Sequence, residues 1–183
     1  MANEISPLEI QDFIDAGLDR VYPGNWKRSI DVFSVIEADG IGILVIHDIK
    51  YNIINIKAGV LTGLTFSPEL VRDVGEMNTD VPVGAYVLYE GNPEYWRLKY
   101  SIKLRYNWVD PQSRSSALMV LNSLHVVPAL VNNGIERLSP KHGGEPWGGP
   151  PEGEEDGEAF SWALHIGDAD DISRIMSWLN EAS

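Results

Sequence analysis

The sequence predicts an α+β fold with the element order α-β3-α-β2-α, in which a five-stranded antiparallel sheet carries helices packed on one face. Two helices are indicated by Pro7 and Pro68, because each proline follows a serine that can cap a helix and occupies the first helical position. A β-hairpin is indicated by Gly40, which follows an aspartate between two apolar runs. A long strand is indicated by residues 95–108, in which apolar and polar side chains alternate.

The first two helices have recognisable starts and stops. The first is expected after Ser6, since apolar residues recur at helical spacings as far as Val21, and a Pro-Gly-Asn turn then ends it. The second is expected after Ser67, with a buried stripe that begins at Leu70, and it ends before Pro82.

The strands are predicted from apolar runs bounded by turn residues. Three are expected before the second helix, at 32–38, 41–47 and 51–58, and two after it, at 83–89 and 95–108. The two glycines that follow the third strand indicate its exit from the sheet. The last strand is longer than most strands, so we expect it to bend or to contain a bulge.

A third helix is expected from Ser113, and Pro128 should kink or stop it. The domain proper is then expected to be residues 1–140, an α+β unit. Residues 141–158 are rich in Gly, Pro and Glu, a composition typical of an acidic linker or a long surface loop. Residues 159–183 are expected to form a short C-terminal element with an amphipathic helix.

Composition excludes several classes of function. Asp and Glu number 27 against 14 Lys and Arg, a net charge of −13, which argues against nucleic acid and anionic membrane as partners. The absence of cysteine excludes disulfides, thiol catalysis and thiolate metal sites. The N-terminus has no basic segment, and no consecutive apolar run approaches the ~20 residues of a membrane span. We therefore expect a soluble, cytoplasmic protein.

Three features together resemble a known family: the hairpin at Gly40, the Met-Asn pair at Asn78 that ends the second helix, and the long strand 95–108 leading into 113–127. In topology and pattern, over residues 5–138, the chain resembles the YbjN-type sensory-transduction regulators of bacteria, which have the type III secretion chaperone-like fold. The resemblance implies a small cytoplasmic protein, often a homodimer, that binds other proteins and has no assigned catalysis. It supplies no functional residues to transfer.

Catalytic chemistry has little support in the sequence. The chain contains no phosphate-binding loop, nucleophile elbow or dinucleotide-binding motif. His47, followed by an aspartate, is either an oriented base or an ordinary polar pair at a strand end, and we favour the polar pair. No histidine has metal-ligand spacing to another. We therefore predict no catalytic residue, no cofactor and no metal ligand. The histidines are His47, His125, His142 and His165.

The polar side of the predicted strand 95–108 is basic in an acidic protein. It is either a solvated outer face or a docking surface for an acidic partner, of which the chain's own residues 152–158 are one candidate. Trp108 at the strand's end and Trp147 in the linker are candidate aromatic anchors. The residues predicted to bind a partner are Arg97, Lys99, Lys103, Arg105, Trp108 and Trp147.

These observations favour a non-enzymatic protein-interaction domain, chaperone-like or regulatory, that binds a protein partner through the sheet face or a dimer surface. Residues 172–179, with Trp178, either dock in cis on the sheet or serve as a helical ligand in a groove of a partner. The alternative function is a small-molecule-binding or enzymatic domain. Its polar pocket would lie near Arg105, Asn107, Asp110 and Arg114.

Overall fold

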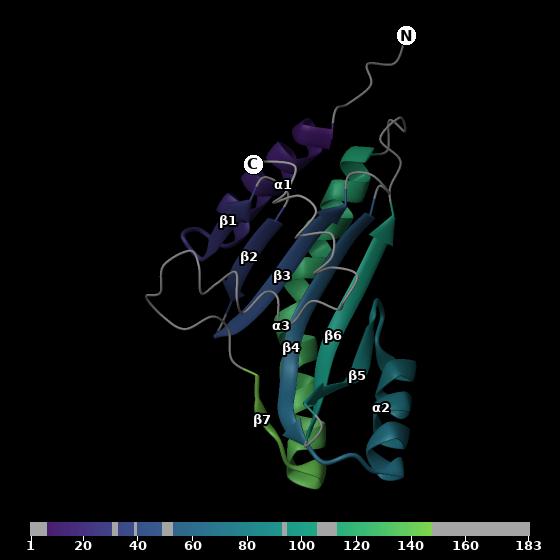
Figure 1. The fold of residues 1–183 in the computed structure, drawn as a ribbon. Coiled ribbons are helices and arrows are strands. Elements are labelled where there is room, and N and C mark those ends of the chain that lie inside the picture. Colours follow the sequence, from purple (N-terminus) through teal and green to yellow (C-terminus); the bar gives the residue numbers. More distant parts are fainter. Residues whose placement is uncertain are drawn as a thin grey trace.

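The computed structural model describes residues 7–30, 33–38, 40–48, 53–92, 95–105 and 113–147. The helices are α1 (Pro7–Val21), α2 (Pro68–Asp80) and α3 (Ser113–His142). The strands are β1 (Trp26–Ile30), β2 (Phe33–Ala38), β3 (Ile41–Asp48), β4 (Ile53–Leu64), β5 (Ala85–Asn92), β6 (Tyr95–Arg105) and β7 (Glu145–Pro146). The predicted α+β class is confirmed (Figure 1).

The strands form one antiparallel sheet in the order β1-β2-β3-β4-β6-β5, with β7 paired to β4. The five predicted strands are present as β2 to β6, and the sheet also includes β1 and β7. β4 continues through Gly59 and Gly63, which were expected to leave the sheet. The register shifts between β4 and β6 after Gly59 place the extra residues in β4, so the bulge expected in the last strand is not seen in the described residues of β6. The predicted strand end at 106–108 lies outside the described residues.

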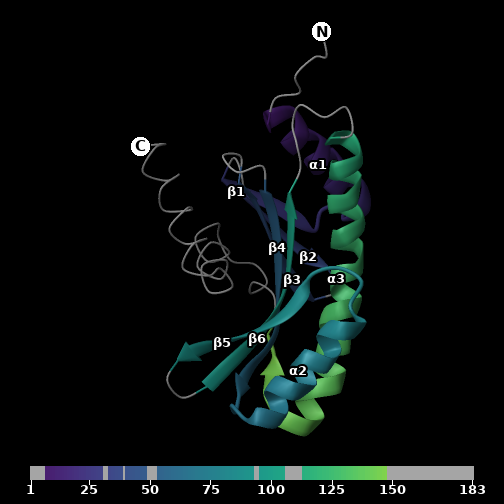
Figure 2. The ribbon, with the colours of Figure 1, turned by 90° about the vertical axis from the view of Figure 1, so that its right-hand side faces the viewer.

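The helices lie on one side of the sheet, and no helix of the described residues lies on the other (Figure 2). α3 packs along β4, α1 packs against α3, and α2 packs beside β5 and the far end of α3. The apolar side chains between helices and sheet form the core. They include Ile14, Leu18, Ile43, Ile56, Val60, Tyr100, Ile102, Leu124 and Val131.

α3 continues through Pro128, where a kink or stop was expected. A proline cannot donate the backbone hydrogen bond that the carbonyl four residues earlier would accept, here the carbonyl of Leu124. The phenolic hydroxyl of Tyr22, just after α1, donates to that carbonyl instead, at 3.1 Å. The packing of α1 against α3 thus satisfies the carbonyl that the proline leaves free.

Within α3, the stretch Leu118–His142 contains an 18-residue window with a mean hydropathy of 1.3, and by length and composition it could cross a membrane. A search for consecutive apolar residues does not detect this stretch, because serine, histidine and asparagine interrupt it. Its buried side chains, among them Val120, Val127 and Leu138, pack in the core against the sheet. A helix that packs in the core of a globular protein can therefore have the length and composition of a membrane-spanning helix.

Candidate partner-binding face

The face of the sheet opposite α3 carries the basic residues of β6. Leu98, Tyr100 and Ile102 belong to the core beneath the helices. Because side chains alternate along a strand, the residues between them point to the opposite side. Lys57 of β4 pairs with Ser101 and lies on that same side. We call this side the basic face, defined by Lys57, Arg97, Lys99, Lys103 and Arg105.

Aromatic rings surround two of these cations. The guanidinium carbon of Arg97 lies 5.0 Å from the ring centroid of Trp147 and 5.3 Å from that of Tyr95, and Arg97 Nη2 donates to the Tyr95 hydroxyl at 2.9 Å. Lys99 Nζ lies 4.7 Å from the ring centroid of Tyr89, which is itself 6.2 Å from the Trp147 ring. We call these five residues the aromatic–basic cluster. Such distances place the cations within reach of the ring quadrupoles.

Trp147 reaches the cluster because β7 pairs with β4. The backbone N–H of Trp147 donates to the carbonyl of Val60 at 3.0 Å. The indole then lies over Gly59, where a Cβ atom would be only 2.7 Å from Trp147 Cδ2. A side chain at position 59 would therefore push the indole away. Gly59, which was expected to mark the exit from the sheet, instead leaves the space that the indole ring occupies.

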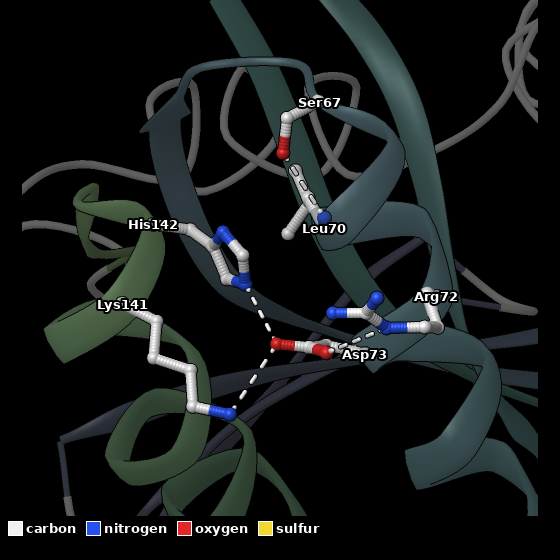
Figure 3. A network of polar contacts seen from close by, with 6 residues as sticks. All are labelled: Ser67, Leu70, Arg72, Asp73, Lys141 and His142. Atoms are coloured by element: carbon white, nitrogen blue, oxygen red, sulfur yellow. Dashed lines mark hydrogen bonds and ion pairs between the residues drawn. The ribbon is translucent and has the colours of Figure 1, made fainter.

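The end of α3, from which the chain turns towards Trp147, is held by α2 (Figure 3). His142 Nε2 lies 2.9 Å from Asp73 Oδ2, and Lys141 Nζ lies 3.4 Å from the same oxygen. The hydrogen bond from His142 is the main cause that lowers the pKa of Asp73. The N-cap of α2 is the predicted one, since Ser67 Oγ accepts from the N–H of Leu70 at 3.0 Å.

The turn between α3 and β7 is also fixed by local hydrogen bonds. Gly143 and Gly144 have φ values of 70° and 84°, a left-handed conformation that favours glycine. The N–H of Gly143 donates to the carbonyl of Ser139 at 2.9 Å, and Ser139 Oγ donates to the carbonyl of Gly144 at 3.2 Å. The start of the predicted linker, up to Trp147, is thus ordered backbone, whereas 148–158 and 159–183 lie outside the described residues.

The structure brings three of the predicted partner-binding residues together, namely Arg97, Lys99 and Trp147. Lys103 and Arg105 are exposed and lie further along β6, outside the cluster. Trp108 lies outside the described residues.

Sequence reasoning missed several members of this face. The sequence places Tyr89 and Tyr95 in predicted strands without indicating a role for either. Gly59 and Lys57 were not connected with the face at all. The available signal was the alternation of β6 itself, which places Tyr95 on the same side as Arg97.

The candidate base His47 is a core residue. It is 1% exposed and lies on the helix side of β3, where it pairs with Ile54. Burial, assisted by the positive charge of Arg28, lowers the pKa of His47 to about 4. Arg28 in turn forms an ion pair with Asp15 of α1. The imidazole is therefore neutral near pH 7 and has no access to a substrate, as expected for a structural residue.

The structure does not test the polar pocket of the alternative function. Arg105 is exposed, while Asn107, Asp110 and the side chain of Arg114 lie outside what the structure describes. A cavity of about 560 Å³ lies between the end of α1 and the middle of α3, lined by residues that include Tyr22, His125 and Asn132. In the described ranges, no three His, Asp or Glu residues are grouped so that they could hold a metal ion.

Solved structures include chains similar to this one. No family model matches the chain, and no curated protein matches it. Among solved structures, the chain is similar to one described as "Crystal structure of YbjN, a putative transcription regulator from E. coli", with a TM-score of 0.46 and 13% identity. The similarity covers 69% of this chain and 93% of that chain.

Proposed function

We propose that this chain is a protein-interaction domain, chaperone-like or regulatory, which binds an acidic segment of polypeptide on the basic face. The aromatic–basic cluster carries the proposal: two cations, Arg97 and Lys99, lie among three aromatic rings on the side of the sheet away from the helices. Tyr, Trp and Arg are the residues that most often dominate binding energy at protein interfaces.

The sign of the charge supports an acidic partner. The chain carries a net charge of −13, so most of its surface repels acidic polypeptides, whereas the basic face attracts them. Electrostatic complementarity of this kind selects the face on which a partner docks. It also makes binding sensitive to salt.

The state of Arg97 supports carboxylate recognition in particular. Its Nε is buried and has no hydrogen-bond partner within the described part of the chain. A buried donor without an acceptor is costly, and a carboxylate can accept from a guanidinium through two parallel hydrogen bonds. A Glu or Asp side chain of a partner would therefore complete the hydrogen bonding of Arg97 while an apolar neighbour in the partner packs on Trp147.

The test measures binding of a fluorescein-labelled peptide of glutamate and leucine to the full chain by fluorescence anisotropy at low ionic strength. Arg97→Ala should weaken binding by ~10-fold, because a charge-assisted hydrogen bond contributes ~1.5–3 kcal/mol. Arg20→Ala, which removes an exposed cation of α1, is the matched control and should change affinity by less than ~2-fold. Equal losses of affinity in both variants would refute the proposal.

A further inference from the structure

Three apolar side chains of the sheet are buried on the side away from the helices. Leu44 and Ile46 are 0% exposed and Ile53 is 6% exposed, yet none of them belongs to the core cluster beneath α3. Leu44 pairs with Lys57 and Ile46 pairs with Asn55, which places this apolar patch directly beside the basic face. Lys57 and Lys99 are each 4% exposed.

Leu44, Ile46 and Ile53 are not covered by the described helices or by β7. All three described helices lie across the other side of the sheet (Figure 2), and β7 reaches only Leu61 and Thr62 of β4. Lys57 and Lys99 each have at least one interaction partner. A sheet face that carries Leu and Ile next to lysines needs a cover that is both apolar and acidic.

We propose that the cover is the C-terminal segment 148–183 of the same chain, which docks across the basic face and the apolar patch. The path of the chain supports this occupant, because Trp147 already lies on this face above Gly59. Leu44 pairs with Lys57, two residues away from Gly59, which is about 7 Å along β4. The segment therefore begins at the edge of the surface that it would cover.

The composition of the segment matches both parts of the surface. Its first half is acidic and can face the lysines and Arg97. In residues 172–179 apolar residues recur at the spacing typical of an amphipathic helix, and they can face Leu44 and Ile46. Arg174 is its one Lys or Arg residue. Its acidic residues are Glu152, Glu154, Glu155, Asp156, Glu158, Asp168, Asp170, Asp171 and Glu181.

This cover rests on the proposed function and adds a regulatory step to it. The segment and an acidic partner present the same chemistry to the same face, so they compete. Attachment to the chain gives the segment an effective concentration in the millimolar range, while each exposed ion pair contributes only ~0–1 kcal/mol. The segment is therefore an intramolecular competitor that a stronger partner displaces.

Docking itself is tested on the full chain by zero-length coupling of lysines to carboxylates, followed by mass spectrometry. A mixture of ¹⁴N- and ¹⁵N-labelled chains separates coupling within one chain from coupling between two. We expect cross-links within single chains from Lys99 or Lys103 to acids of 152–158. Cross-links that join only different chains would assign the cover to a second copy, and coupling of these lysines only to acids elsewhere would overturn the proposal.

Competition is tested with the same labelled peptide. In the full chain, replacing Glu152, Glu154, Glu155 and Glu158 by Gln should tighten peptide binding by ~10-fold at low ionic strength. The control makes the same change in net charge on the exposed surfaces of the helices. It consists of Asp12→Asn, Glu69→Gln, Glu76→Gln and Glu136→Gln.

The outcomes separate the two proposals. Tighter binding by the tail variant alone supports the cover, because the control excludes a general effect of net charge. Equal binding by all three proteins overturns the cover and leaves the proposed function in place. Failure of all three to bind the peptide refutes the proposed function, and the cross-links then decide whether the segment docks.

Discussion

The hydroxyl of Tyr22 donates a hydrogen bond to the carbonyl oxygen of Leu124, at 3.1 Å, four residues before Pro128 in α3. The proline has no N–H for that carbonyl, and the tyrosine supplies the missing donor from outside the helix. A residue next to α1 thus makes an unbroken α3 possible. α3 runs from one end of the sheet to the other, and β7 and Trp147 follow its C-terminal end.

Removing this donor should destabilise the protein only while the proline is present. Tyr22→Phe leaves a buried carbonyl unpaired and should lower the free energy of unfolding by ~1–2 kcal/mol. In a Pro128→Ala background the alanine N–H can pair with Leu124, so the same substitution should cost less than ~0.5 kcal/mol. Urea unfolding of the four proteins gives this double-mutant cycle. Equal costs in both backgrounds would show that the hydroxyl does not replace the missing N–H.

Stability should fall as the pH drops from about 7 to about 5, because His47 must be neutral in the folded state. Its pKa is lowered from 6.5 to about 4 by burial and by Arg28. Below pH ~6.5 the unfolded chain binds a proton that the folded chain does not, so the loss at pH ~5 is ~2 kcal/mol. The loss continues until the pH reaches the folded pKa of about 4.

The measurement is the free energy of unfolding at both pH values for the wild type, His47→Gln and the exposed-site control His125→Gln. His47→Gln should remove most of the dependence, and His125→Gln should retain it. Asp73 does not interfere, since its pKa is below the ordinary 3.8 and its contribution is lost only as the pH falls below that value. An unchanged slope in His47→Gln would contradict the assignment.

The order of helices and strands could be predicted from the sequence because its signals are local. A serine and proline start α2, Gly40 has the positive φ of a hairpin turn at 76°, and the alternation of β6 marks a strand. β1 was missed because Trp26–Ile30 is a short strand at the sheet edge with two adjacent cations. Propensity and pattern are weakest for such edge strands.

The candidate site could be predicted only in part, because its contacts join distant positions. Arg97 lies near Trp147 because β7 pairs with β4. No local sequence pattern predicts a two-residue strand inside a glycine- and proline-rich stretch. The continuation of α3 through Pro128 depends on Tyr22, which lies 102 residues before Leu124. The rule that proline breaks a helix considers an isolated helix. Here a residue outside the helix supplies the hydrogen-bond donor that the proline lacks.

Substitution of Asn78 should lower the stability of the protein more than substitution of most polar residues. Its side-chain amide bonds both backbone groups of one residue in β5, as a neighbouring strand would. Its Nδ2 donates to the carbonyl of Tyr86 at 3.0 Å, and its Oδ1 accepts from the N–H of Tyr86 at 2.7 Å. Tyr86 is buried, so Asn78→Ala leaves two backbone groups of β5 unpaired and should cost ~2–3 kcal/mol. Thr79→Ala, at the exposed neighbour, should cost less than ~0.5 kcal/mol in the same thermal or urea unfolding experiment. Similar costs at both positions would contradict this role.

Gly59→Ala should move the indole of Trp147 without unfolding the sheet. The new methyl group would lie 2.7 Å from Trp147 Cδ2, closer than carbon atoms approach one another, and the ring can move away more easily than β4 can. In protein labelled with 5-fluorotryptophan, the ¹⁹F resonance that disappears in Trp147→Phe should shift in Gly59→Ala, while the other tryptophan resonances stay in place.

Binding of the acidic peptide should weaken in Gly59→Ala for the same reason, since Arg97 would lose the ring 5.0 Å away. Gly75→Ala is the matched control: Gly75 is exposed in α2 with nothing within 4 Å of a new Cβ, so the change should leave ¹⁹F resonances and peptide affinity unaltered and raise stability by ~0.5–1 kcal/mol. If Gly59→Ala shifts the Trp147 resonance but keeps full affinity, the ring is not part of the binding surface, and the cations of β6 alone hold the peptide.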